Sequence, residues 1–292
     1  MIKIWFMVFS LVLSFHSFGN LEVDGDLSAG TNSNVSNAIS DEDIFSDQFT
    51  TANFRFGKLW VPQPGRSVLL RGHLGLQRFK NSEGLNRQSL GGSASYIHRA
   101  GLGAYAPRFN LSARADYRDF KGAVRDGWLF RVSAALQKRF TPHLNGVLTL
   151  SHERRTADEA KAIALFADVP KDVFNQTNNE ITAAVGYAVV AESILTLAYR
   201  YRQGEVDSST NPGSAYVPLA KGKARDNALC KRCENYIAYL VDAKSHSFTL
   251  NLSRSLGRDT SIGANFERRI SQMDGDNTYT ANIFSVELIG RF

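Results

Sequence analysis

The ten-residue stretch IFSVELIGRF, from Ile283 to Phe292, decides the fold. Every second residue of the stretch is apolar or small, and these residues form one face: Phe284, Val286, Leu288, Gly290 and Phe292. The residues between them include the charged Glu287 and Arg291. A period of two is typical of a β-strand with one apolar face and one wetted face.

The same alternation recurs upstream, in the segments 128–139, 181–189, 195–202 and 248–253. The segments are joined by connections of two alternating sizes. The short ones fall at 62–65, 106–108, 141–143, 191–192 and 257–259. The long, polar ones fall near 32–47, 80–87, 119–127, 156–177, 205–243 and 271–277.

Five short and six long connections predict twelve strands with both chain ends on one side. This rhythm is typical of transmembrane barrels, which have short periplasmic turns and long extracellular loops. We therefore expect an all-β fold, a single antiparallel transmembrane β-barrel over residues 20–292. A soluble β-sandwich is disfavoured because charged side chains stand at mid-strand, where a sandwich core would bury them unpaired. Aromatic residues also gather at strand ends on the apolar face, as in membrane-interface girdles.

The first nineteen residues differ from the rest. Lys3 precedes the apolar run Ile4–Leu13, and Ser17 and Gly19 occupy the small-residue positions of a cleavage site. This arrangement predicts a secretory signal peptide over 1–19, with an uncleaved anchor as the alternative. The formal net charge is +6, but the arginines are spread along the strands, which does not favour nucleic-acid binding.

The segment ending at Phe292 resembles the C-terminal signal read by the outer-membrane barrel assembly machinery. The whole chain resembles uncharacterised proteobacterial outer-membrane barrel proteins, through the stretches 125–128, 153–158 and 242–248. The stretch Gly30–Val35 loosely resembles the first strand of barrels in polysaccharide and surface-lipoprotein export. These resemblances imply a cell outer-membrane location and, as partners, membrane lipid and the assembly machinery.

If the apolar face meets lipid, the other face lines the lumen, where arginine outnumbers acid. Two functions are compatible: a narrow porin-like channel that mildly favours small anionic solutes, and a non-conducting barrel with a structural, assembly or export role. The expected lumen-lining residues are Arg55, Arg71, Arg114, Asp116, Arg118, Arg131, Glu153, Arg200, Arg202, Glu267, Arg269 and Glu287. Glu22, Asp24 and Asp26 of the first strand are expected to lie near Glu287 and Arg291.

An outer-membrane hydrolase is the third possibility, and it is disfavoured. Ser151 and Glu153 should point to one side of a strand and His152 to the other, which argues against a catalytic triad. No enzyme activity, cofactor or metal site is therefore expected. In an oxidising compartment, Cys230 and Cys233 predict a small structural disulfide in the fifth external loop. The stretch 158–166 has roughly helical spacing and predicts a short helix at the barrel mouth.

Overall fold

The computed structural model describes residues 21–158, 172–211, 213, 220–226, 229, 236–273 and 277–292. The expected signal peptide, Cys230 and Cys233 lie outside these residues, as does nearly all of the expected helix. Three short 3-10 helices lie in the connections, at Asp41–Asp43 (η1), Glu83–Leu85 (η2) and Ala123–Arg125 (η3). No helix in the described part of the chain is long and apolar enough to cross a membrane.

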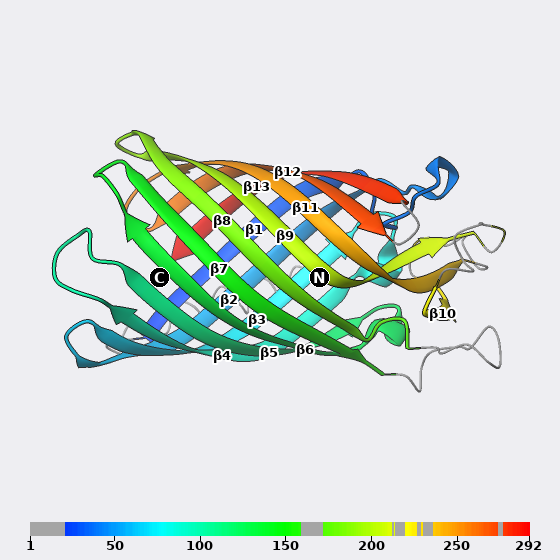
Figure 1. The fold of residues 1–292 in the computed structure, drawn as a ribbon, viewed down its shortest axis with the longest axis horizontal. Helices are drawn as coiled ribbons and strands as arrows, with labels where there is room; N and C mark the ends of the chain where they lie inside the picture. The colour runs from blue at the N-terminus through cyan, green and yellow to red at the C-terminus, as the bar shows by residue number, and fades with distance from the viewer. Residues whose placement is uncertain are drawn as a thin grey trace, which may run out of the picture.

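Twelve strands form a closed antiparallel barrel, which confirms the expected fold (Figure 1). The barrel closes through pairing of the first and last strands, from Asp24 opposite Arg291 to Asn32 opposite Ile283. The twelve strands are β1 (Leu21–Asn32), β2 (Asp47–Gln63), β3 (Arg66–Phe79), β4 (Arg87–Arg99), β5 (Arg108–Phe120), β6 (Gly127–Arg139), β7 (Leu144–Ala157), β8 (Gln176–Val190), β9 (Ser193–Thr210), β11 (Ile237–Ser255), β12 (Thr260–Met273) and β13 (Thr278–Arg291).

A thirteenth strand, β10 (Gly222–Arg225), lies in the connection between β9 and β11 and pairs with Ile237–Leu240. This connection is shorter than the expected 205–243, because β9 continues to Thr210 and β11 begins at Ile237. The two strands go on pairing with each other to the end of this extension. The run Ile237–Val241 is buried throughout, so it lacks the alternation that marks the lipid-facing strands.

The outer surface of the barrel is apolar over its middle. Leu90, Leu111, Leu197 and Phe248 are each more than half exposed, as expected of side chains whose solvent is lipid. Trp128 stacks on Phe130 and meets Tyr117 edge to face, with ring centroids 6.0 and 5.5 Å apart. Such exposed aromatics suit a membrane interface. The closed ladder satisfies backbone polar groups that lipid could not.

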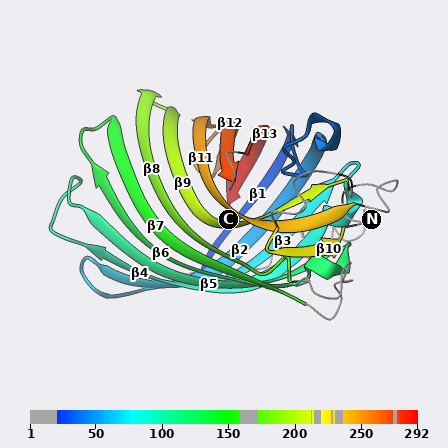
Figure 2. The same ribbon diagram turned by 45° about the vertical axis from the view of Figure 1, so that its right-hand side comes forward.

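The most deeply buried residues lie at the long-loop end and not at mid-barrel. One cluster joins Val206, Tyr239 and Met273, and a second joins Phe174 and Leu240. We call this region the cap, and it comprises residues 33–46, 121–126, 172–175, 204–210, 220–226 and 236–243. Figure 2 shows β10 and the beginning of β11 at this end of the barrel.

The cap crosses the mouth of the barrel. Three of its parts lie at the long-loop ends of β1, β5 and β9, which stand a third of the circumference apart in the order of strands. The Ser209 N–H nevertheless donates to the Ser36 carbonyl at 2.9 Å, and Arg125 binds Asp207. Gly204, with φ +148°, lies where β9 leaves the wall, a backbone conformation that favours glycine.

Candidate channel interior and its cap

The wall formed by β1, β2 and β3 pairs acidic and basic side chains in the lumen. Arg71 donates to Glu22 at 2.8 Å, and Arg55 lies 2.9 Å from Asp26 and also binds Asp24. Asp24 stands opposite Arg55 in the strand register, so the pairing follows from the alignment of β1 with β2. The three acids thus meet arginines of β2 and β3. As expected, Asp24 stands opposite Arg291 in the register of β1 with β13, but among the described residues no ion pair joins Arg291 to these acids.

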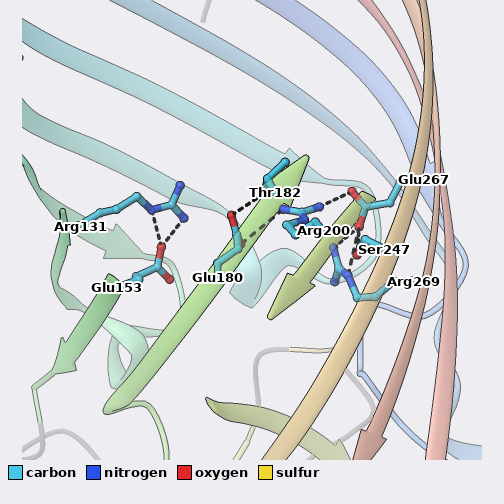
Figure 3. A network of polar contacts seen from close by, with 8 residues as sticks. All are labelled: Arg131, Glu153, Glu180, Thr182, Arg200, Ser247, Glu267 and Arg269. Atoms are coloured by element: carbon cyan, nitrogen blue, oxygen red, sulfur yellow. Dashed lines mark hydrogen bonds and ion pairs between the residues drawn. The ribbon is translucent and has the colours of Figure 1, made fainter. Parts of the chain in front are cut away.

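A second network lies on the opposite side, on β8, β9, β11 and β12 (Figure 3). Glu267 accepts hydrogen bonds from Arg200 at 2.7 Å and from Arg269 at 2.8 Å. Ser247 donates to the same carboxylate at 3.2 Å, and Glu180 lies 3.9 Å from Arg200. Charge-assisted bonds of this kind hold the side chains across the strands.

At mid-barrel, Arg114 stands directly opposite Arg131 in the ladder. Like charges in this position repel, and each arginine has its own acid. Arg131 Nε donates to Glu153 at 3.0 Å, and Arg114 binds Asp116. Both arginine side chains are 44% exposed, so water reaches this part of the interior.

Toward the long-loop end of the lumen, four arginines form no ion pair with any carboxylate that the structure describes: Arg87, Arg118, Arg155 and Arg202. Sequence reasoning anticipated Arg118 and Arg202 and missed the other two. Arg155 could have been found by extending the alternation two residues beyond Glu153. Arg87 was assigned to a loop, although it begins β4.

Two anchors hold the cap. Arg125 is buried and binds Asp207 and, at 2.6 Å, Asp226. Burial alone would lower the pKa of Arg125, but Asp226 and Asp207 raise it above its ordinary value. On the other side, Asp43 accepts a hydrogen bond from the Tyr236 hydroxyl at 2.9 Å. Burial and this bond raise the pKa of Tyr236 to about 12.

A cavity of about 170 Å³ lies between the cap and the wall. Arg87 and Arg155 line it from β4 and β7, and Arg125 and Asp207 line it from the cap. The remaining lining residues are Val35, Ser36, Asn37, Gln77, Phe79, Leu85, Phe120 and Ser209.

The histidines lie on both faces. His152 is exposed and bonds to Asn179 at 2.9 Å, away from Ser151 and Glu153. His73 is buried in the lumen and bonds to Ser93 at 2.7 Å, a contact that sequence reasoning missed. In the described part of the chain, the other ring nitrogen of His73 has no hydrogen bond to a carboxylate, so this pair lacks the orienting third group of a triad.

No group of three or more potential metal ligands occurs among the described residues. The apolar residues of the terminal segment lie on the lipid side, where Phe284, Val286, Leu288 and Phe292 are exposed. The backbone N–H of Phe292 donates to the Val23 carbonyl at 2.8 Å and so ties the last residue to β1.

The fold is similar to that of the COG4313 outer membrane channel from Pseudomonas putida F1, with a TM-score of 0.62 and 9% identity. That match covers 96% of this chain and 98% of the channel. The chain is a barrel of the outer-membrane type, and its apolar outer surface places it in the outer membrane.

The KdgM porin in complex with disordered oligogalacturonate and the NanC porin each have a TM-score of 0.49, at 7% and 8% identity. These matches cover 92% of this chain, and 99% and 100% of the two porin chains. No family model and no curated protein matches the sequence.

Proposed function

We propose that the protein is a narrow diffusion channel that favours small anionic solutes. The observation that carries the proposal is the lumen itself, where Arg114 and Arg131 remain 44% exposed at mid-barrel. An interior filled by packed side chains would leave charged groups no such access to water. The interior of a twelve-stranded barrel is also intermediate in width between the filled eight-stranded barrels and the open sixteen-stranded porins.

The anion preference follows from unequal pairing. Arg55, Arg71 and Arg200 are held by acids, whereas Arg118 and Arg202 pair with none that the structure describes. Glu287 offsets part of this excess. Arginine stays protonated at any working pH, so the positive charge is permanent. Charge along a pore selects ions of the opposite sign.

The test is the reversal potential of the refolded protein in a planar bilayer under a salt gradient. Arg118→Gln with Arg202→Gln should clearly reduce the anion preference without leaving a buried acid unpaired. Arg154→Gln with Arg268→Gln is the matched control, because both residues are exposed on the outer wall. Equal potentials for all three proteins would refute the luminal origin of selectivity.

A closed barrel is the second candidate, and the cap favours it. Its two buried clusters and the doubly paired Arg125 fill the extracellular mouth. If the wild-type protein gives no current in a planar bilayer and a variant with a loosened cap, such as Arg125→Leu, conducts, this hypothesis is supported over a constantly open channel.

We further propose that the segment from Phe284 to Phe292 is the signal for the barrel assembly machinery. Phe292→Asp should reduce the amount of protein in the outer membrane at least severalfold, since a charge replaces an exposed aromatic at the lipid face. Leu256→Asp, an exposed change in a periplasmic turn, is the control. Normal outer-membrane levels of the Phe292 variant would contradict the proposal.

A further inference from the structure

Arginine and phenylalanine alternate in a row that runs from the barrel wall into the cap. Arg87 lies 6.0 Å from the ring centre of Phe120, and Arg155 lies 5.3 Å from the same ring. Arg155 also lies 5.9 Å from Phe174, and Arg125 lies 4.2 Å from it. Strands β4, β5 and β7, the segment 172–175 and η3 therefore gather three cations around two aromatic rings.

The rings hold these cations but do not neutralise them. An aromatic face attracts a guanidinium group through its quadrupole and carries no net charge. A guanidinium stacked on a ring keeps its N–H edge free for an anion. Phe120 and Phe174 are both buried, so the cations are fixed in place and partly withdrawn from water.

The acids nearby are already bound. Asp207 accepts from Arg125 and, at 2.6 Å, from Gln176. Lower in the lumen, Glu153 is held by Arg131. Arg155 donates at 3.2 Å to the Arg125 carbonyl, which is neutral. Arg87 and Arg155 thus share one cavity with no carboxylate of their own in the described part of the chain.

We propose that the space between Arg87 and Arg155 is a binding site for a small oxyanion with two negative charges, of which inorganic phosphate is the probe. Two guanidinium groups supply the two charges and the forked donors that an oxyanion accepts. Gln77 lines the same cavity, and its side-chain amide offers a further donor. Its volume of about 170 Å³ suits a group of this size and excludes a polymer.

The proposal deepens the proposed function and rests on it for access, because an anion would reach the site through the lumen. The site itself requires only equilibrium entry and not conduction. In a channel it would concentrate the anion just under the cap, so the current carried by phosphate should saturate as phosphate is raised.

The experiment is calorimetric titration of inorganic phosphate into the folded protein in nonionic detergent at low ionic strength. At about pH 8 most inorganic phosphate is doubly charged, because its second ionisation lies below this pH. Wild type should show saturable binding at one site, competed weakly by chloride. Arg155→Gln and Arg87→Gln should each weaken binding by roughly ten- to hundredfold, the loss expected for a hydrogen bond to a charged group.

The matched control is Arg154→Gln, the neighbour of Arg155 on the same strand, whose side chain is exposed on the outer wall. It removes the same charge and should bind phosphate as wild type does. Equal weakening by Arg154→Gln and Arg155→Gln would overturn the site in favour of a diffuse charge effect. If a glutamine variant fails to fold, Arg155→Lys keeps the cation without the planar fork and should still weaken binding.

The two proposals fail separately. Saturable phosphate binding by a protein that never conducts supports the site and removes the channel. Anion-selective conduction without phosphate binding supports the channel and overturns the site.

Discussion

The wall of β1, β2 and β3 and the wall of β4, β5 and β7 both carry arginines into the lumen, but they differ in counter-charge. On the first wall, Arg55 and Arg71 meet the acids of β1. On the second, Arg87 and Arg155 meet the ring of Phe120. Ion pairs therefore hold the arginines of the first wall, whereas at the long-loop end of the second wall aromatic faces hold them.

This difference shows that a count of luminal charges does not describe the field in a barrel. Paired charges cancel at short range, whereas cations held by rings keep their full charge. The excess positive charge is concentrated toward the extracellular end of one wall. An anion in the lumen would be drawn toward that end, under the cap.

The largest effect is expected from a change at Arg125, which pairs with two carboxylates and also stacks on Phe174. Arg125→Leu removes the cation that binds the buried Asp207 and Asp226, and breaking a buried ion pair costs about 3–5 kcal/mol. The cap should loosen, and limited proteolysis should cut it faster while channel conductance rises. Lys121→Ala in the same connection breaks an exposed ion pair with Glu83 and should change both readouts little. A cap equally resistant in both variants would contradict its anchoring by Arg125.

A smaller effect should follow when the first wall, like the second, carries arginines without acidic partners. Asp24→Asn with Asp26→Asn removes the acids of Arg55 while keeping side-chain volume. The freed positive charge should strengthen the anion preference, measured as a reversal potential. Glu192→Gln, in an exposed periplasmic turn, is the control for net charge. A shift toward cations would show that the pairing assigned to this wall does not govern selectivity.

The smallest effect concerns the second anchor of the cap, the hydrogen bond from the Tyr236 hydroxyl to Asp43. Because the pKa of Tyr236 is raised from its ordinary value of 10.0 to about 12, the hydroxyl form is favoured in the folded cap. Its stabilising contribution is present below about pH 10 and is lost as pH rises toward about 12. Proteolysis of the cap should accelerate across this interval. The increase should be absent in Tyr236→Phe, and an identical pH profile for the two proteins would exclude this anchor.

Much of the barrel could be predicted because strand alternation is a local property. The lipid-facing residues of β13 and the closure into twelve strands follow from a period of two and from the rhythm of the connections. The extension of β9 and β11 could not be found in this way. Ile237–Val241 is buried on both faces, so its pattern resembles neither a lipid-facing strand nor a polar loop.

The electrostatic partners were also out of reach. Arg71 reaches Glu22 across an intervening strand, and Arg125 meets Asp226 from a distant connection. Such contacts depend on the register of several strands at once, which no single segment encodes. The Arg–Phe row depends in addition on Phe174, which lies in a long loop without a periodic pattern.

The pairing of β1 with β13 has a consequence for the time before the barrel is complete. The register places Asp24 opposite Arg291, so one edge of β1 stays unpaired until the last strand has formed. This pairing joins the two strands that are farthest apart in the sequence, and such contacts form slowly. An open edge invites pairing with another chain and aggregation. Glu22, Asp24 and Asp26 place three charges along this waiting strand, and inward-pointing charges are a means by which proteins discourage such contacts. The acids that pair with Arg55 and Arg71 in the finished barrel thus protect the unfinished one.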